Sequence, residues 1–166
     1  ALSSGEPEVN AYPFTTKRLH VGHFEHRRRI YQMVDTPGLL DRPMVERNDI
    51  EMQAIAALEN VGSIAVYLMD PSESGGNSML TQENLLAEVT DMLGDTPVLV
   101  VDGKMDLLGL KEGDSVNPDS GHIVISATEG WGLEELKSIL IEKIGADIIE
   151  DPLELPEGWH RKHRPD

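Results

Sequence analysis

Short apolar runs alternate along this chain with longer segments in which apolar residues recur at helical spacing. Residues 19–24 and 30–34 are compatible with strands, and the polar residues 25–29 between them predict a hairpin with a basic tip. Continuous apolar runs, typical of strands covered on both faces, predict three further strands at 63–70, 97–101 and 122–125.

Apolar residues three and four positions apart predict three amphipathic helices, at 45–60, 78–93 and 133–144. Residues 71–77 and 107–120 are rich in turn formers and predict loops, the second with at most a short helix. This alternation of strands and helices predicts an α/β fold with an open, mostly parallel sheet and helices on both of its faces.

The predicted elements form one domain over residues 1–146, and residues 147–166 form a proline-punctuated tail or linker. Residues 1–5 resemble the end of a helix closed by Gly5, so we expect a longer parent protein with a front piece before Ala1.

Composition limits the class of protein. The 166 residues include 39% hydrophobic residues, enough for one core, and no cysteine, which excludes disulfides and thiolate chemistry. The sequence has neither a signal peptide nor an apolar run long enough to span a membrane, so we expect a cytoplasmic protein with no membrane partner.

The formal net charge is −16, but Lys17 to Arg29 contains five bases and one acid, a net +4 that leaves −20 for the rest. Such an acidic surface repels nucleic acid over most of its area and argues against DNA binding. Because the acids are spread along the chain, adaptation to high salt is favoured over an acidic face for a basic partner; composition leaves both open.

Candidate chemistry lies where the predicted strands end, because open α/β sheets bind ligands at the carboxyl ends of their strands. The run 30–34 is followed by Asp35-Thr36-Pro37-Gly38, a D-x-x-G pattern suited to sensing a γ-phosphate and its magnesium. Asp35 can hold Mg²⁺ through water, and Gly38 can offer its backbone N–H to the phosphate. Alone, the tetrapeptide is equally typical of an ordinary β-turn.

Two more strand ends carry polar motifs. Asp102-Gly103-Lys104-Met105-Asp106 follows one predicted strand, and Ser126-Ala127-Thr128 follows the last. In this order, the three motifs are those of a GTPase domain.

The combination resembles the Obg family of GTPases, since Tyr12-Pro13-Phe14-Thr15-Thr16-Lys17 precedes Asp-Thr-Pro-Gly-Leu-Leu-Asp-Arg-Pro. Within that family, residues 21–27, 39–48 and the loop Asp70-Pro71-Ser72-Glu73 are similar to the nucleolar-type Nog subfamily and its archaeal relatives. The resemblance covers about residues 1–145 and implies a G domain of the P-loop NTPase type.

The resemblance implies specific roles in a nucleotide site that takes GTP or GDP with Mg²⁺. Thr16, or alternatively Thr15, is the switch threonine that ligates Mg²⁺ beside Asp35 and orients the attacking water, while Gly38 senses the phosphate. Asp106 accepts the guanine N1 and N2 protons, a pattern adenine cannot match. Further nucleotide contacts are assigned by the resemblance to Thr36, Pro37, Lys104, Ser126 and Ala127.

Three features depart from the family pattern. The G-x-x-x-x-G-K-[ST] loop is absent together with its strand, so phosphate affinity should collapse and the sheet should lack its central strand. Gly103 replaces the asparagine of the guanine motif, which puts guanine selectivity in doubt. Leu39 stands where many GTPases place a water-positioning glutamine, so intrinsic hydrolysis should be slow, as is normal for Obg relatives.

Other residues have plainer interpretations. Strand alternation turns His20, His23 and His26 to different faces, which disfavours a metal site. The arginines 27–29 suit either RNA phosphates or a solvated tip. The seven methionines favour core packing.

Two functions follow as hypotheses. In the first, the parent protein hydrolyses GTP to GDP and phosphate and is a switch in large ribosomal subunit biogenesis, a role implied by the resemblance alone. In the second, the chain is a degenerate, nucleotide-independent G domain that binds ribosomal RNA or protein through its basic hairpin and tail.

Overall fold

The computed structural model describes residues 2, 8–10, 19–35 and 62–146. The predicted helix at 45–60 and the predicted tail at 147–166 lie outside the described residues. Within the described part of the chain, no helix combines the length and apolar character needed to span a membrane.

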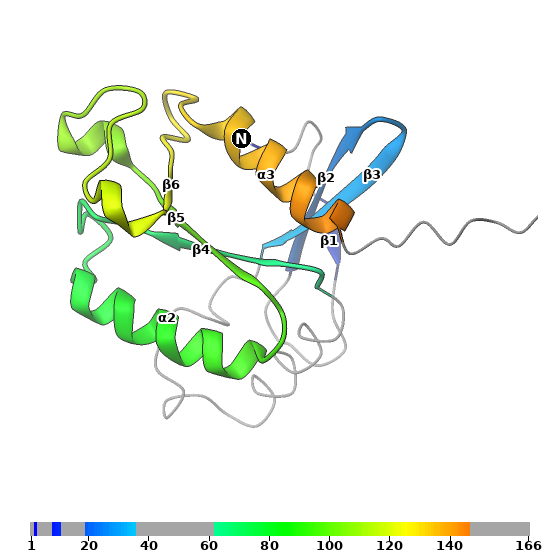
Figure 1. The fold of residues 1–166 in the computed structure, drawn as a ribbon, viewed down its shortest axis with the longest axis horizontal. Helices are drawn as coiled ribbons and strands as arrows, with labels where there is room; N and C mark the ends of the chain where they lie inside the picture. The colour runs from blue at the N-terminus through cyan, green and yellow to red at the C-terminus, as the bar shows by residue number, and fades with distance from the viewer. Residues whose placement is uncertain (1, 3–7, 11–18, 36–61, 147–166) are drawn as a thin grey trace, which may run out of the picture.

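A parallel sheet with a helix on each face forms the larger part of the described structure (Figure 1). Its strands, in order, are β4 (Ala65–Met69), β5 (Val98–Asp102) and β6 (Ile123–Val124), and helices α2 (Met79–Leu93) and α3 (Leu133–Ala146) flank it. Val101 and Ile123 pack with Leu136 and Leu140 of α3 in one buried cluster. The near-continuous apolar composition of these strands is explained by this cover on both faces.

Helix α2 begins at a defined cap. The Ser78 hydroxyl accepts the Thr81 N–H at 3.2 Å, and Glu73 Oε1 accepts the Met79 N–H at 2.8 Å. These two side chains satisfy amide groups that the helix itself leaves without partners, so the loop before α2 is bound to its first turn.

The remaining strands form an antiparallel sheet, in which β1 (Glu8–Asn10) pairs with β2 (Leu19–His26) and β2 pairs with β3 (Arg29–Asp35). Arg27 and Arg28 form the turn between β2 and β3, with φ angles of 48° and 66°. Two-residue hairpin turns of type I′ require positive φ at both positions, and this backbone matches the twist of the strands. The two arginines adopt it with steric strain, because their Cβ atoms disfavour the left-handed conformation.

The hairpin is anchored by stacked aromatic rings. Phe24 and Tyr31 are opposite each other in the register, their centroids are 5.0 Å apart, and their planes differ by 6°. Both side chains are buried, and the Lys137 ammonium of α3 lies 5.5 Å from the Phe24 centroid. Through this contact, the antiparallel hairpin packs against the last helix.

The α/β class predicted from the sequence is confirmed, and the strands and helices that were predicted within the described residues begin and end within two residues of their predicted ranges. Strand β1 was not predicted, because its three residues carry no apolar alternation. Instead of one sheet, the described strands form two three-stranded sheets, and none of them joins β3 to β4.

Strand β4 carries apolar side chains that the described fold leaves open. Val66 and Leu68 are 42% and 60% exposed, and in the parallel register they lie beside Leu99 and Val101, on the face that α3 covers further along the sheet. Tyr67 and Met69 point to the opposite face, where α2 packs. Helix α3 therefore covers β5 and β6 but leaves part of β4 uncovered.

Phe24→Ala should lower the free energy of unfolding by about 3–5 kcal/mol, because it removes a buried ring that stacks on Tyr31. Urea unfolding followed by circular dichroism measures this loss. Ile30→Ala, beside Tyr31 but 71% exposed, is the matched control and should change stability by no more than about 0.5 kcal/mol. Equal losses in the two variants would contradict the anchoring role of the stack.

Candidate functional site

The carboxyl ends of β4, β5 and β6 hold a short loop, residues 103–106, between them. Gly103 N–H donates to the Met69 carbonyl at 2.8 Å on one side, and Ile125 N–H donates to the Asp102 carbonyl at 2.8 Å on the other. Met105 N–H also donates to the Ile125 carbonyl at 3.3 Å, and the Met105 side chain is buried. The backbone of the predicted guanine motif is therefore fixed to both neighbouring strands.

Asp106 and Ser126, predicted to serve the same site from distant positions in the sequence, are in contact. Ser126 is fully buried, and its Oγ donates to Asp106 Oδ1 at 2.6 Å while accepting the Glu129 N–H at 3.1 Å. The half-buried carboxylate of Asp106 is thus held in one orientation by a hydroxyl whose second hydrogen bond is already made.

Lys104 lies at the outer edge of the same loop. Its backbone is left-handed, with φ of 57°, and its side chain is 48% exposed. The ammonium contacts Asp70 Oδ2 at 2.7 Å and donates to Ser74 Oγ at 2.9 Å. Because Asp70 directly follows β4 and Lys104 follows β5, the ion pair connects the ends of two neighbouring strands.

Asp70 is the acid at this edge whose ionisation is most strongly affected. Burial acts to raise its pKa, but hydrogen bonds from Lys104, Ser72, Gly75 and Ser74 outweigh that effect and hold the pKa of the carboxyl well below its usual range. The carboxylate is therefore ionised at neutral pH.

Asp70 was missed as a site residue by the sequence reasoning. Its position directly after an apolar run is the same signal that selected Asp35 and Asp102, and the loop 70–73 entered only as part of a family resemblance. No pattern in the sequence shows that Asp70 reaches Lys104, because 34 residues separate the two partners.

The other predicted site residues are placed as follows. Asp35 is the last residue of β3, opposite His20 in the antiparallel sheet, and it is exposed. Ala127 is exposed beside Ser126. The Ser126 N–H donates to the Trp131 carbonyl at 3.1 Å. Thr16, Thr36, Pro37 and Gly38 lie outside the described residues.

Gly103, which departs from the family pattern, is buried against β4. A Cβ at this position would lie 3.0 Å from Leu68 Cδ1 and 3.4 Å from the Met69 carbonyl oxygen. Glycine therefore lets the loop approach β4 closely enough for its 2.8 Å bond to Met69. A larger residue would have to displace the exposed Leu68 side chain.

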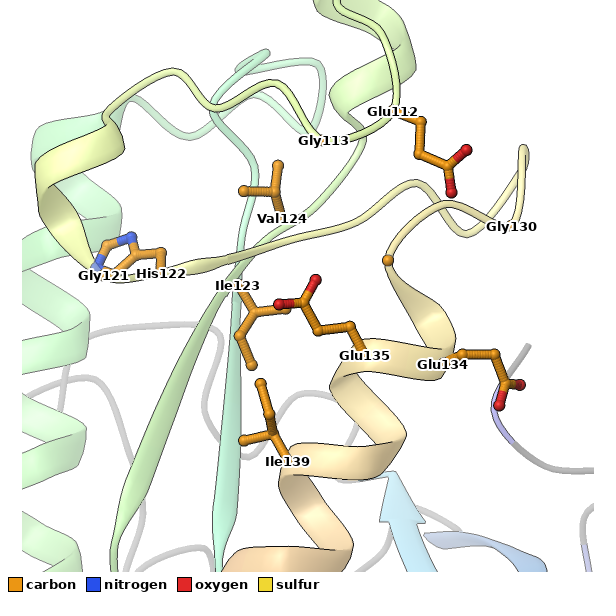
Figure 2. Close-up of a pocket in the computed structure, with 11 residues that line it drawn as sticks. Glu112, Gly113, Gly121, His122, Ile123, Val124, Gly130, Glu134, Glu135 and Ile139 are labelled. Atoms are coloured by element: carbon orange, nitrogen blue, oxygen red, sulfur yellow. The ribbon is translucent and has the colours of Figure 1, made fainter.

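A separate pocket of about 550 Å³ lies between β6, the loop at 112–113 and the start of α3 (Figure 2). Glu112, Glu134 and Glu135 come to it from two elements, and His122 lies at the end near Gly121, 3.1 Å from the buried Asp102 carboxylate. None of Lys104, Asp106, Ser126 and Ala127 lines it. Among the described residues, no cluster of histidines and acids could hold a metal ion.

Sequence comparison with known proteins finds a matching family model and several relatives. The family model for nucleolar GTP-binding protein 1 (NOG1) matches residues 49–106. Nucleolar GTP-binding protein 1 of Encephalitozoon cuniculi is 42% identical over 162 residues, which are 97% of this chain and 30% of that protein. An uncharacterized protein of Methanocaldococcus jannaschii is 46% identical over 107 residues, 64% of this chain and 29% of that protein. The chain thus spans less than a third of the length of these relatives.

Solved structures agree on the fold. A Plasmodium falciparum structure assigned as nucleolar GTP-binding protein 1 matches with a TM-score of 0.71 and 28% identity, over 88% of this chain and 77% of that one. The G domain of the T. maritima FeoB iron transporter matches with a TM-score of 0.63 over 86% of each chain, at 21% identity. The described fold is therefore that of a G domain.

The lowered pKa of Asp70 makes stability depend on acidity. Because the folded-state pKa lies below the unfolded value of about 3.9, the carboxylate stabilises the fold above that value, and its contribution is lost as the pH falls below it. Asp70→Asn should lower the free energy of unfolding at neutral pH and lose less of it on acidification than the wild type. Urea unfolding at several acidic pH values measures how the free energy of unfolding of each protein changes with pH. Parallel pH dependences of wild type and variant would contradict the stabilising role of the Asp70 carboxylate.

Proposed function

Because this chain is a Nog-type G-domain sequence related to nucleolar GTP-binding protein 1, we propose that it binds the guanine base of GTP and GDP at the carboxyl edge of its parallel sheet. The observation that carries the proposal is the Asp106 carboxylate, fixed by the buried Ser126 hydroxyl beside the exposed Lys104. A fixed carboxylate accepts two N–H donors from guanine, whereas adenine has no such pair to offer.

The neighbouring groups complete a base site. The Lys104 stem is exposed next to Asp106 and can lie across the face of the base, where its charge also favours the ring. The Ser126 amide is taken by Trp131, so the Ala127 N–H is the donor we assign to the guanine oxygen. The Asp106 carboxylate would accept the two guanine N–H groups, and the Ala127 N–H would donate to the guanine oxygen.

We assign the phosphate end of the nucleotide to other residues of the chain. Asp35, exposed at the end of β3, suits Mg²⁺ held through water, since this cation takes one or two carboxylates and keeps most of its waters. Bound Mg²⁺ would neutralise phosphate charge during transfer. We propose that Thr36, Pro37 and Gly38 contact the nucleotide, and that Thr16 joins Asp35 around the metal.

The proposed activity is hydrolysis of GTP to GDP and phosphate, in which Thr16 and the Gly38 N–H position the attacking water and the γ-phosphate. With Leu39 after Gly38, no side-chain amide follows to hold the water, so turnover is slow without a partner. We further propose that this hydrolysis is a switch in large ribosomal subunit biogenesis, with ribosomal RNA or protein as partner. The name of the relatives, nucleolar GTP-binding protein 1, supports the GTP-binding part of this role.

Titration of the purified chain with fluorescent GTP and ATP analogues and Mg²⁺, at low and high salt, tests nucleotide binding. Micromolar or tighter binding of GTP over ATP supports the proposal and shows that the phosphates are held despite the expected absence of a glycine-rich loop. Absence of binding by a chain that circular dichroism shows to be folded contradicts it.

Asp106→Asn should lower GDP affinity by about 30- to 100-fold, because an amide presents a donor where guanine also presents donors. The same variant should gain affinity for xanthosine diphosphate, whose C2 oxygen accepts that donor. Asp119→Asn removes an exposed acid outside the site and is the matched control. Equal loss for both nucleotides would indicate damaged folding instead of a changed base site.

A second candidate function, binding of ribosomal RNA without nucleotide, is favoured by the hairpin tip. Arg27, Arg28 and Arg29 are consecutive and exposed on a chain with net charge −16, and two of them occupy strained positive-φ positions. Asn-Gly would form this turn without strain, so arginine at both positions suggests selection for charge. The stem is held rigidly by the Phe24 and Tyr31 stack.

The double variant Arg27→Asn/Arg28→Gly should keep or improve the hairpin and weaken binding to a short RNA duplex. With three arginine contacts, log affinity should fall with log salt at a slope of about 3, and the variant should reduce that slope by about 2. Lys143→Ala in α3 removes an exposed base elsewhere and should leave both slope and affinity unchanged. An unchanged slope in the double variant contradicts this candidate.

A further inference from the structure

The Asp70 carboxylate is surrounded by donors from its own loop and from the predicted base site. Oδ2 accepts from Lys104 Nζ at 2.7 Å, Gly75 N–H at 2.9 Å and Ser74 Oγ at 3.0 Å. Oδ1 accepts from the Ser72 hydroxyl and from the Ser72 N–H at 3.2 Å. With its side chain only 18% exposed, Asp70 is the centre around which residues 70–75 are wound, and Lys104 is its only charged donor among the described residues.

Helix α2 fixes the backbone of the same residue. Asp70 N–H donates to Gln82 Oε1 at 2.7 Å, and Gln82 Nε2 donates back to the Asp70 carbonyl at 3.0 Å. The same amide also donates to the Asn77 carbonyl at 3.0 Å, so it closes the loop 70–77 at both ends. Gln82 is buried, and the Tyr67 hydroxyl of β4 donates to the main-chain carbonyl of Gln82 at 3.0 Å.

These contacts form one continuous path. It runs from α2 through the Gln82 side chain to the Asp70 backbone, then through the Asp70 carboxylate to the Lys104 ammonium. Every step is a hydrogen bond of 3.0 Å or less. A buried glutamine that makes two backbone bonds to one residue is costly to replace, because each lost partner leaves a polar group unsatisfied in the interior.

From this path we infer that Asp70 is a positioning residue for Lys104 at the proposed guanine site, and that Gln82 makes the position of Lys104 depend on α2. The inference rests on the proposed function, since it takes Lys104 as a base contact. It adds loop 70–77 as a third wall of the base site, beside loop 103–106 and residues 126–127.

A lysine benefits from such a holder. Its ammonium ends a flexible four-carbon stem that loses rotamer entropy when it is ordered, and ordering it before the ligand arrives removes that cost from binding. An exposed ion pair would not achieve this, because solvent screens it and either partner leaves easily. Asp70 differs, since four further hydrogen bonds hold its carboxylate in place when the lysine moves.

A double-mutant cycle with GDP as the probe separates positioning from plain loop stabilisation. Asp70→Asn and Lys104→Met should each lower GDP affinity about tenfold, and the double variant should be no weaker than Lys104→Met alone, because Asp70 acts through Lys104. Glu73→Gln is the matched control: it removes a charge from the same loop but contacts Met79, and affinity should stay within about twofold. Losses that add in the double variant would overturn the inference.

Hydrogen exchange of the nucleotide-free chain tests, independently of nucleotide binding, whether the Asp70 carboxylate is fixed without help from Lys104. The Gly75 amide donates to Asp70 Oδ2, whereas the Asp70 amide donates to Gln82. Asp70→Asn should speed exchange of the Gly75 amide, because it weakens the acceptor, whereas Lys104→Met should leave that amide unchanged, because the other hydrogen bonds hold the carboxylate in place. Equally fast exchange of Gly75 in the two variants would overturn the inference, since the loop would then depend on the lysine. If the variants show the expected exchange pattern but the wild type binds no GDP, the proposed function fails and the positioning of Lys104 by Asp70 stands.

Discussion

The candidate site depends on the parallel pairing of β5 with its two neighbours. The register that places Met69 beside Asp102 brings the ends of β4 and β5 level, and the Ile125 amide continues the ladder past the end of β6. Parallel strands end at one edge, so residues separated by 20 or more positions meet there without long loops. Asp106, Ser126 and Asp70 owe their mutual positions to that edge.

Most of the fold could be predicted because apolar runs and helical spacing report burial directly. The parallel strands, both described helices and the basic hairpin follow from such patterns, whereas the G-domain class comes from the motifs at the strand ends and the family resemblance. Strand β1 could not be predicted, since Glu8, Val9 and Asn10 are held by pairing with β2 and not by their own preferences. The division into two sheets depends on which strands find partners, and local sequence does not encode pairing.

The candidate site was predictable only in part, for a related reason. Motifs after strands identified Lys104, Asp106 and Ser126, because the edge of a parallel sheet is a place that sequence can indicate. The ring of donors around Asp70 and the glutamine behind it come from three segments, and their contacts exist only in the packed structure. The Ser126 amide shows the same limit, because its bond to Trp131 arises from a bend that no motif describes.

The left-handed backbone of Lys104 sets stability against function at a single position. A lysine at φ of 57° is strained relative to glycine, which adopts this conformation at no steric cost. By backbone strain alone glycine or asparagine would be favoured at position 104, whereas the ion pair with Asp70 favours the lysine. The proposed base site gives a use for an ammonium at this position, and a variant stabilised by glycine there would be a folded protein that lacks this ammonium.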